Sequence, residues 1–449
     1  MADPMFAFDG KMADLIFDYC RERLSLDPVP LDYGGAGDDV VDALTGLVGA
    51  DGHDPAVVLR AFTEHLATAV ISVDSPRFLS FIPAAPTKAA LLFDMVVSCS
   101  SLQGTSWLEA AGAIAAENQA LGVLADLAGL PRAAGGAFVS GGTAGNLSAL
   151  LVARDRGGRR AGGVPRIACS DEAHSSIAKA LQVLGVAPLV VPTLDHRLTG
   201  PALEAALQAA GTAAEVVAVV ATAGTTNAGI IDDLDGVAAV AATWGLWFHV
   251  DAAYGGAGLF SPSLRPLYHG IERADSLIVD PHKWLFAPFD CAALLYRDPA
   301  GARAVHAQDA AYLDPIHEGP GAGWNPSDYA LHLTRRARGL PLWFSLAVHG
   351  TRAYATAVDT VVATARAAAA MIEAAPHLEL LRPPELSIVL FRRRGWAQGD
   401  YDAWSARLLA DQVGFVVPTS FGGEPVARLA FLHPDTTLEM VAEILDSMA

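Results

Sequence analysis

The chain has 449 residues, of which 52% are hydrophobic and 18% are charged. This composition excludes a disordered or fibrous protein, and the length is enough for about three domains with large buried cores. Lys and Arg number 30 against 49 Asp and Glu, which gives a formal net charge of −19. Bulk charge therefore does not favour binding to nucleic acid or to an anionic membrane, and no uninterrupted apolar run approaches the ~20 residues that a membrane span needs.

The amino-terminal residues and the cysteines indicate the compartment. The first twenty residues carry early acids and lack a basic start followed by an apolar run, so we expect no secretory signal. The four cysteines lie far apart, without CxxC or metal-ligand spacing, at positions 20, 99, 169 and 291. We therefore expect a reduced, cytoplasmic enzyme with no metal site.

Residues 1–78 are predicted to form a helical amino-terminal segment. Apolar residues recur at three- and four-residue spacing in 8–24 and again in 54–71, as on one face of a helix. The stretch 26–39 between them is rich in Pro and Gly and is expected to be a linker.

Residues 79–344 are predicted to form a large α/β domain. Short valine- or alanine-rich runs alternate there with helical segments, and the expected strands are 137–140, 166–170, 215–224, 246–254, 276–284 and 291–298. Strands that are apolar on both faces and separated by helices indicate a mostly parallel sheet covered on both sides. The Gly- and Pro-rich stretch 306–326 is expected to be a mobile catalytic loop, and a smaller α+β domain is expected over 345–449.

Polar residues follow the predicted strands, where open parallel sheets bind their ligands. In chain order these are Gly141, Gly142 and Thr143, then Asp171 and His174, then Thr225 and Thr226, then Asp251, and last His282 and Lys283. Taken singly, each has an ordinary structural explanation: a tight turn, a helix cap, a satisfied histidine or a turn hydroxyl. The glycine turn is neither GxGxxG nor GxxxxGK[ST], which argues against dinucleotide and P-loop sites.

The combination is more specific, and lysine usage sharpens it. Only four of the 30 basic residues are lysines, and Lys283 is the one flanked by aromatic and aliphatic residues. A lysine in such a setting can form a Schiff base with an aldehyde. A strand-end carboxylate can keep a pyridine nitrogen protonated, and a helix amino terminus can hold a phosphate. These are the three attachments that a pyridoxal 5′-phosphate site needs.

From about residue 78 to 345 the sequence resembles the pyridoxal-phosphate-dependent group II decarboxylases, which include the aromatic-L-amino-acid, tyrosine, tryptophan and glutamate enzymes. The resemblance is carried in order by FLSFIPAAPT, SWLEAAG with LAGLP, SGGTAGNLSALLVAR, SDEAHSSI, ATAGTTNAG, WFHVDAAYGG, ADSLIVDPHKWLFAPFDCA and AAYL. It implies the aspartate-aminotransferase-like fold, called fold type I, with a seven-stranded sheet. It also implies a homodimer with the active site at the interface.

The resemblance implies a role for each matching residue. Lys283 would form the Schiff base, Asp251 would pair with the pyridine nitrogen, and His174 and Ala253 would cover the two faces of the ring. The phosphate would be held by Gly142, Thr143 and His282, with Thr225 beside the cofactor or substrate. Tyr312 would deliver the proton after CO₂ leaves, and substrate contacts are expected at Pro83, Ala84 and Thr105.

Four positions depart from the pattern of this family. Gly145 and Asn146 stand where many relatives carry an acid and a small residue or threonine, and Asp280 stands where animal relatives usually have asparagine. Thr105 occupies a position that is bulky and aromatic in the animal aromatic-acid enzymes.

The expected activity is decarboxylation of an L-amino acid, and an aromatic amino acid is the substrate that we expect before any other. The alternatives are an oxidative aldehyde synthase, a decarboxylase of acidic or branched substrates, a Rossmann-type oxidoreductase and a scaffold without catalysis. The presence of Tyr312 and His174 argues against the aldehyde synthase. The missing GxGxxG and the combination of Asp251 with Lys283 argue against the oxidoreductase, and a scaffold without catalysis would need loss of the lysine or of the loop, both of which are present.

Overall fold

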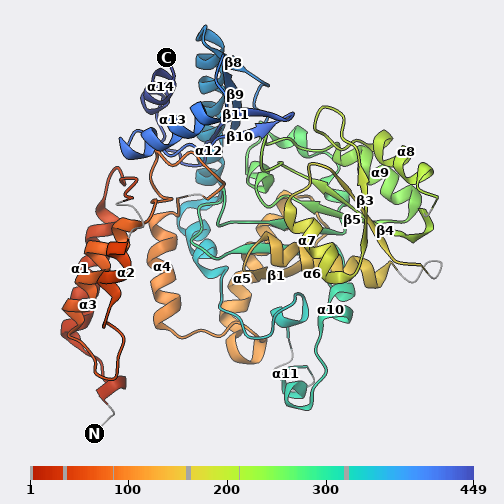
Figure 1. Ribbon diagram of the computed structural model, residues 1–449. Coiled ribbons are helices and arrows are strands. Elements are labelled where there is room, and N and C mark those ends of the chain that lie inside the picture. Colours follow the sequence, from red (N-terminus) through yellow and green to blue (C-terminus); the bar gives the residue numbers. More distant parts are fainter. Residues whose placement is uncertain (1–3, 34–37, 84, 158–162, 212, 318–322) are drawn as a thin grey trace.

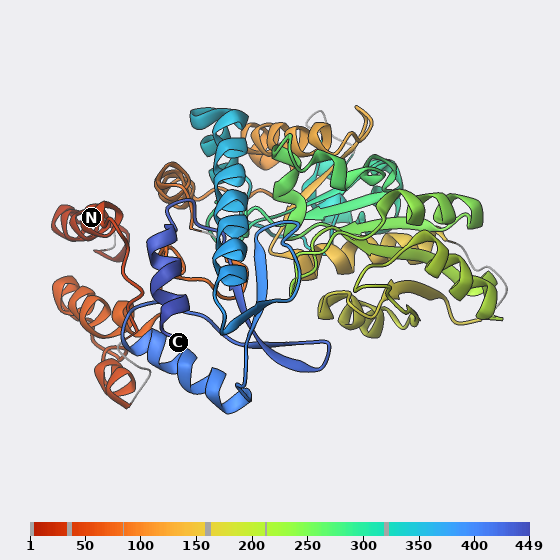
Figure 2. The same ribbon diagram turned by 90° about the horizontal axis from the view of Figure 1, so that it is seen from above.

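The computed structural model describes residues 4–33, 38–83, 85–157, 163–211, 213–317 and 323–449. A large sheet with helices on both sides forms one end of the molecule, and a small carboxy-terminal sheet with its helices packs beside it (Figure 1). Helix α12 (Leu340–Ala374) passes between the two, which is clearest in the view from above (Figure 2).

The large sheet has seven strands in the order β1-β7-β6-β5-β4-β2-β3. Their bounds are β1 Gly135–Val139, β2 Arg166–Ser170, β3 Ala187–Val191, β4 Val216–Thr222, β5 Trp247–Asp251, β6 Ser276–Val279 and β7 Ala292–Tyr296. Only β7 runs antiparallel to its neighbours β1 and β6, whereas the remaining neighbours pair in parallel. The predicted mostly parallel seven-stranded sheet of fold type I is therefore confirmed.

Strand β3 is the one strand of this sheet that the sequence patterns missed. It lies at the sheet edge, and its residues alternate between half-buried and exposed before the buried Val191. The central strand β4, by contrast, is buried along its whole length. An edge strand that carries Pro188 lacks the continuous apolar run by which buried parallel strands are recognised.

Helices connect successive strands, so the parallel strands present their carboxyl ends, and the polar residues there, at the same edge of the sheet. Helix α6 (Gly142–Arg156) follows β1, α7 (Ser175–Leu184) follows β2, and α9 (Leu234–Trp244) precedes β5. Helices α7 and α9 both end at a left-handed glycine, Gly185 and Gly245, as expected for glycine C-caps.

The carboxy-terminal part contains a four-stranded antiparallel sheet in the order β10-β11-β9-β8. Its strands are β8 Leu378–Leu380, β9 Ile388–Arg393, β10 Thr419–Phe421 and β11 Glu424–Ala430, with helices α13 Gln398–Ala410 and α14 Leu438–Asp446. The proposed boundary at residue 345 falls inside α12, which is interrupted at Gly350, where φ is 75°. The division into 1–78, 79–344 and 345–449 stays a prediction.

The amino-terminal helices lie at the periphery in both views (Figures 1 and 2). Helices α1 (Gly10–Ser25) and α3 (Pro55–Ala61) contain no buried residue, and apolar side chains of α1 such as Ile16 and Phe17 are exposed. The second predicted helix is shorter than expected, because α3 passes into a π-helical turn at Phe62–Leu66.

The stretch expected to be a loop, 306–326, contains two short turns of helix at Ala311–Leu313 and at α11 (Asp314–His317). Residues 318–322 lie outside the described residues. The mobility of this stretch stays a prediction.

One helix in the described part of the chain, α12, is long and apolar enough to cross a membrane by length and composition. Core helices pass the same test, and α12 buries side chains such as Val358 and Ala365.

Candidate active site

A cavity of about 270 Å³ lies at the carboxyl ends of the strands, and most of the residues predicted from the sequence meet there. Nine of them line it: Gly141, Gly142, Thr143, His174, Thr226, Asp251, Ala253, His282 and Lys283. They come from five strand ends far apart in the chain, which is the arrangement expected at the rim of an open α/β sheet.

The amino terminus of α6 forms one wall of the cavity. The N–H of Gly142 donates to Oδ2 of Asp280 at 3.0 Å. A Cβ atom at Gly142 would lie 2.9 Å from that oxygen and 3.3 Å from Cβ of Ala253, so the close approach requires glycine. The dipole of this helix end favours a negative charge, and the Asp280 carboxylate already lies there.

The Lys283 ammonium also meets Asp280, at 3.2 Å from Nζ to Oδ2. The sequence predicted an apolar setting for this lysine, and the following residues, Trp284 and Leu285, are indeed fully buried. The carboxylate partner was missed, because Asp280 was noted only as a departure from the pattern of relatives. Asp280 therefore holds both the lysine and the helix end.

Asp251 is the last residue of β5 and is buried. Its carboxylate accepts hydrogen bonds from the N–H of Ala253 at 3.1 Å and from Nδ2 of Asn146 at 2.9 Å. Two donors compensate for burial of the charge, which would otherwise be costly. The side chain both caps the following turn and lines the cavity.

The two histidines of the cavity are held by hydrogen bonds to Nδ1. His174 caps α7, and its Nδ1 lies 2.9 Å from Oγ of Ser176. Nδ1 of His282 accepts from the N–H of Cys291 at 2.9 Å, and burial lowers the pKa of this imidazole. His282 is thus neutral at neutral pH with its proton on Nε2, which lies 3.6 Å from Oδ2 of Asp280.

Thr225 is placed differently from the other predicted residues. Its hydroxyl accepts from the N–H of Ile230 at 3.1 Å inside its own turn, and it does not line the cavity. Thr222 and Thr226 line it instead. Thr222 ends β4 directly beside Asp251, and a register that pairs these two residues could have identified it from sequence.

Three further predicted residues in the described part of the chain are not brought to its cavity. Thr105, Tyr312 and Pro83 do not line it, and Ala84 lies outside the described residues. The Tyr312 side chain is 71% exposed. The carbonyl of Thr105 accepts from the N–H of Ser327, which follows the 306–326 stretch.

Arg428 is a residue near the cavity that the sequence patterns missed. It lies in β11, is buried, and donates to the carbonyl of Thr226 at 2.6 Å and to that of Phe81 at 3.3 Å. Burial lowers its pKa to about 10. An arginine inside the apolar run VARLAF is the signal that could have identified it, because buried arginines are rare unless they are paired.

The donor set fits pyridoxal 5′-phosphate. Within the described part of the chain, no partner reaches the buried atoms Thr222 Oγ1 and Asp280 Oδ1, and both residues line the cavity. Buried polar atoms in native proteins are normally satisfied, so unpartnered ones in a cavity indicate a polar ligand. A lysine for the aldehyde, a carboxylate for the ring nitrogen and a helix terminus for the phosphate surround the same space.

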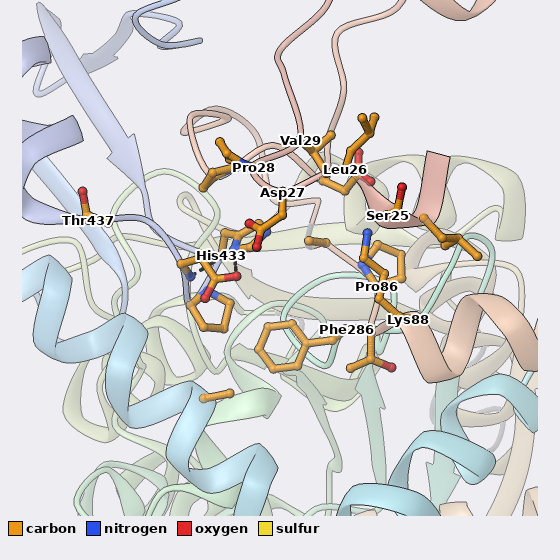
Figure 3. A pocket seen from close by; sticks show the side chains of 18 of the residues that line it. Ser25, Leu26, Asp27, Pro28, Val29, Pro86, Lys88, Phe286, His433 and Thr437 are labelled. Atoms are coloured by element: carbon orange, nitrogen blue, oxygen red, sulfur yellow. Dashed lines mark hydrogen bonds and ion pairs between the residues drawn. The ribbon is translucent and has the colours of Figure 1, made fainter. Parts of the chain in front are cut away.

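A larger cavity of about 740 Å³ lies elsewhere, between the end of α1, the start of α4 (Lys88–Cys99) and the carboxy-terminal part (Figure 3). Asp27, Lys88, Phe286 and His433 are among its lining residues. Size alone would favour it, but the smaller cavity gathers the lysine, aspartate and histidines that the chemistry requires. Among the described residues, no group of three or more His, Cys, Asp or Glu is arranged to hold a metal ion.

Comparison with known proteins identifies the family of the chain. Residues 51–394 match the model of the pyridoxal-dependent decarboxylase conserved domain. The chain is 29% identical to an aromatic-L-amino-acid decarboxylase of Bacillus atrophaeus, over 99% of this chain and 94% of that protein. It is 35% identical to an L-2,4-diaminobutyrate decarboxylase of Rhizobium meliloti, over 84% and 78%. The crystal structure of Oryza sativa TDC with PLP and tryptamine superposes with a TM-score of 0.91 at 25% identity, covering 100% of this chain and 99% of that one.

The chain belongs to the pyridoxal-dependent decarboxylase family. It is a pyridoxal-phosphate-dependent amino-acid decarboxylase, a carboxy-lyase, and the predictions of family, enzyme class and cofactor are confirmed.

Proposed function

We propose that the cavity around Lys283 is the active site and that its substrate is an aromatic L-amino acid. The observation that carries the site is the convergence of Lys283, Asp251 and His174 with the α6 terminus on one cavity. Lys283 would hold the cofactor covalently, Asp251 its ring nitrogen, and the α6 terminus with His282 its phosphate.

The cofactor, when bound, supplies an electron sink for the electrons released as CO₂ leaves. The residues of the chain would orient the cofactor and protonate Cα. The Asp251 carboxylate, fixed by its two donors, favours the protonated ring nitrogen and so stabilises charge that develops in the transition state. Tyr312 would donate the proton at Cα, which requires its phenol within hydrogen-bond reach.

Attachment at Lys283 can be tested by borohydride reduction of the purified holoenzyme followed by peptide mapping. A pyridoxyl label is expected on Lys283. A label on Lys11, Lys88 or Lys179 in its place would reject the assignment.

The aromatic preference is supported by relatives that include aromatic-L-amino-acid and tryptophan decarboxylases, and we propose Phe81 as an aromatic contact near the cavity. Arg428 bonds the carbonyls of Phe81 and Thr226, so Phe81 lies close to a residue that lines the cavity. The Phe81 side chain is 59% exposed and would offer an aromatic substrate a ring to pack against.

A second candidate substrate is L-2,4-diaminobutyrate. It is favoured by the 35% identity to the Rhizobium meliloti enzyme, which exceeds that to the aromatic enzyme of Bacillus atrophaeus. Amine and CO₂ release across tryptophan, tyrosine, phenylalanine, 2,4-diaminobutyrate, glutamate and a branched amino acid separates the candidates. The aromatic proposal fails if kcat/KM for diaminobutyrate, glutamate or the branched substrate exceeds that for every aromatic one.

We further propose that the enzyme is a homodimer whose active site is completed by a second copy. Tyr312 and Thr105 do not line the cavity of their own chain, and α1 exposes apolar side chains. Large exposed apolar patches mark interfaces. Mixing Lys283→Ala and Tyr312→Phe chains tests this proposal. If the sites are shared between the two chains, the mixed dimer has one site with both Lys283 and Tyr312 and regains amine formation. If each site is self-contained, amine formation does not recover.

A further inference from the structure

Asn146 is a buried amide at the start of α6 that connects two proposed active-site residues. It is 1% exposed. Its Nδ2 donates to Oδ2 of Asp251 at 2.9 Å and to Oγ of Ser176 at 3.0 Å. Its Oδ1 lies 2.9 Å from Nε2 of His249. All of its hydrogen-bonding groups face named partners, and none is left for solvent.

The chemistry of the partners fixes how this amide is turned. An ionised carboxylate only accepts hydrogen bonds, so the NH₂ group must face Asp251. The carbonyl then faces His249, whose Nε2 must carry a proton to donate to it. Nδ1 of His249 lies 2.8 Å from Oγ of Ser276, which already accepts from Nε1 of Trp247 at 2.8 Å and therefore has its own hydrogen free for His249. Burial lowers the pKa of His249 to about 4, in agreement with a neutral ring.

The same amide also sets the direction of the hydrogen bond between Ser176 and His174. Oγ of Ser176 accepts from Asn146, which leaves the Ser176 hydroxyl hydrogen for Nδ1 of His174 at 2.9 Å. The backbone N–H of Ser176 points at the same nitrogen, at 3.2 Å. Two donors directed at Nδ1 leave no room for a proton on it, so the ring proton of His174 is on Nε2.

We propose that Asn146 is a positioning residue: through one amide it holds the Asp251 carboxylate at the cavity and, by orienting the Ser176 hydroxyl, directs a second donor at Nδ1 of His174 in its Nε2–H tautomer. This inference rests on the proposed function of the Lys283 cavity. It extends that function by assigning a fixed hydrogen-bond direction to the two residues that would contact the cofactor ring.

The tautomers can be measured on the cofactor-free wild-type protein. With ¹⁵N-labelled histidine, the resonances of His174 and His249, identified by their loss in single His→Gln variants, are expected to show an unprotonated Nδ1 and a protonated Nε2. A proton on Nδ1 of His174 would overturn the proposal, and this result does not depend on whether any Asn146 variant folds.

The variant Asn146→Asp keeps the size of the side chain but replaces a donor with an acceptor. Two carboxylates at this distance resist ionising together, so one of them would keep its proton to a higher pH than usual. That proton restores the missing donor at low pH and is lost at high pH. We therefore expect the dissociation constant for pyridoxal 5′-phosphate, measured by visible absorbance, to be near the wild-type value at pH 6. At pH 8.5 it should be about 10- to 100-fold weaker than that of the wild type.

The wild-type protein controls for the other titratable groups near the pair. These are His249 on β5, His174 before α7, and Asp280, His282 and Lys283 after β6. Ser148→Ala is the matched variant, because Ser148 is equally buried on α6 but bonds the carbonyl of Ala144 and the N–H of Leu331. It should leave the affinity and its pH dependence unchanged.

The outcomes separate this proposal from the one it rests on. If the wild-type protein binds no cofactor at Lys283, the proposed function itself fails. If it does, and Asn146→Asp follows the wild-type affinity at both pH values, only the role of Asn146 is rejected. If Asn146→Asp and Ser148→Ala change the cofactor affinity equally, Asn146 is only a packing residue and its proposed role is also rejected.

Discussion

The substitution Asp251→Asn probes the charge at the centre of the proposed site. In the wild type, the carboxylate accepts from the N–H of Ala253 and from Nδ2 of Asn146. The amide oxygen of the variant must stay with Ala253, so its NH₂ group would face the NH₂ group of Asn146, which lies 2.9 Å from the carboxylate oxygen in the wild type. Turning Asn146 to relieve this contact would break its bonds to Ser176 and His249.

Two magnitudes follow from this geometry. One unsatisfied buried donor costs about 1–3 kcal/mol of folding stability. Removing one charge of a buried pair costs about 3–5 kcal/mol, which at 1.36 kcal/mol per factor of ten is about a 10²- to 10⁴-fold loss of turnover. We expect part of the cofactor to remain bound, because Lys283 and the phosphate contacts are unchanged.

The assay is release of CO₂ and amine at saturating cofactor, with occupancy read from visible absorbance and stability from thermal unfolding. Asp195→Asn makes the same charge change on a side chain that is 83% exposed, and it should leave all three quantities unchanged. Near-normal turnover of Asp251→Asn at full occupancy would refute the role of this carboxylate.

Three further predictions concern the loop, packing and pH. Tyr312→Phe should slow protonation at Cα so that O₂ competes, giving aldehyde, ammonia and peroxide with the CO₂; unchanged amine yield without peroxide would contradict this. In Gly145→Ala the new Cβ would lie 2.2 Å from Cδ1 of Ile278, so we expect the free energy of unfolding to fall by about 1–3 kcal/mol. Gly122→Ala has open space at its Cβ and should not destabilise the protein. Since burial lowers the pKa of His249 to about 4, the unfolded chain binds the extra proton between about pH 6.5 and 4. Stability should fall as pH drops through that window, by about 3 kcal/mol, and the fall should be weaker in His249→Gln; equal slopes would contradict the assignment.

Much of the site could be predicted from sequence, because it depends on local patterns. A strand is recognised by its apolar run, and a parallel strand presents its carboxyl end to the ligand edge. The residues that follow such runs, among them Asp251 and Lys283, could therefore be assigned to one rim without coordinates. The aromatic and aliphatic neighbours of Lys283 then distinguished it from the three other lysines.

Local patterns predicted less of the structure where an element is stabilised mainly by contacts with its neighbours. Edge strand β3 exposes half of its side chains, and its pairing with β2 decides its structure. Thr225 and Thr226 are adjacent in a turn, and only the fold of that turn directs the first hydroxyl to Ile230 and brings the second residue to the cavity.

Tertiary structure alone decided which polar groups meet. Asn146 and Asp251 are 105 residues apart, Gly142 and Asp280 are 138 apart, and Arg428 and Thr226 are 202 apart. No periodicity or motif spacing encodes such pairs, because each depends on the packing of α6 or β11 against the sheet. Local sequence patterns were enough to predict the fold and the placement of Lys283 and Asp251 at one edge of the sheet. The packing decided the hydrogen bonds that orient them, since a buried donor or acceptor must find its partner wherever the fold brings one.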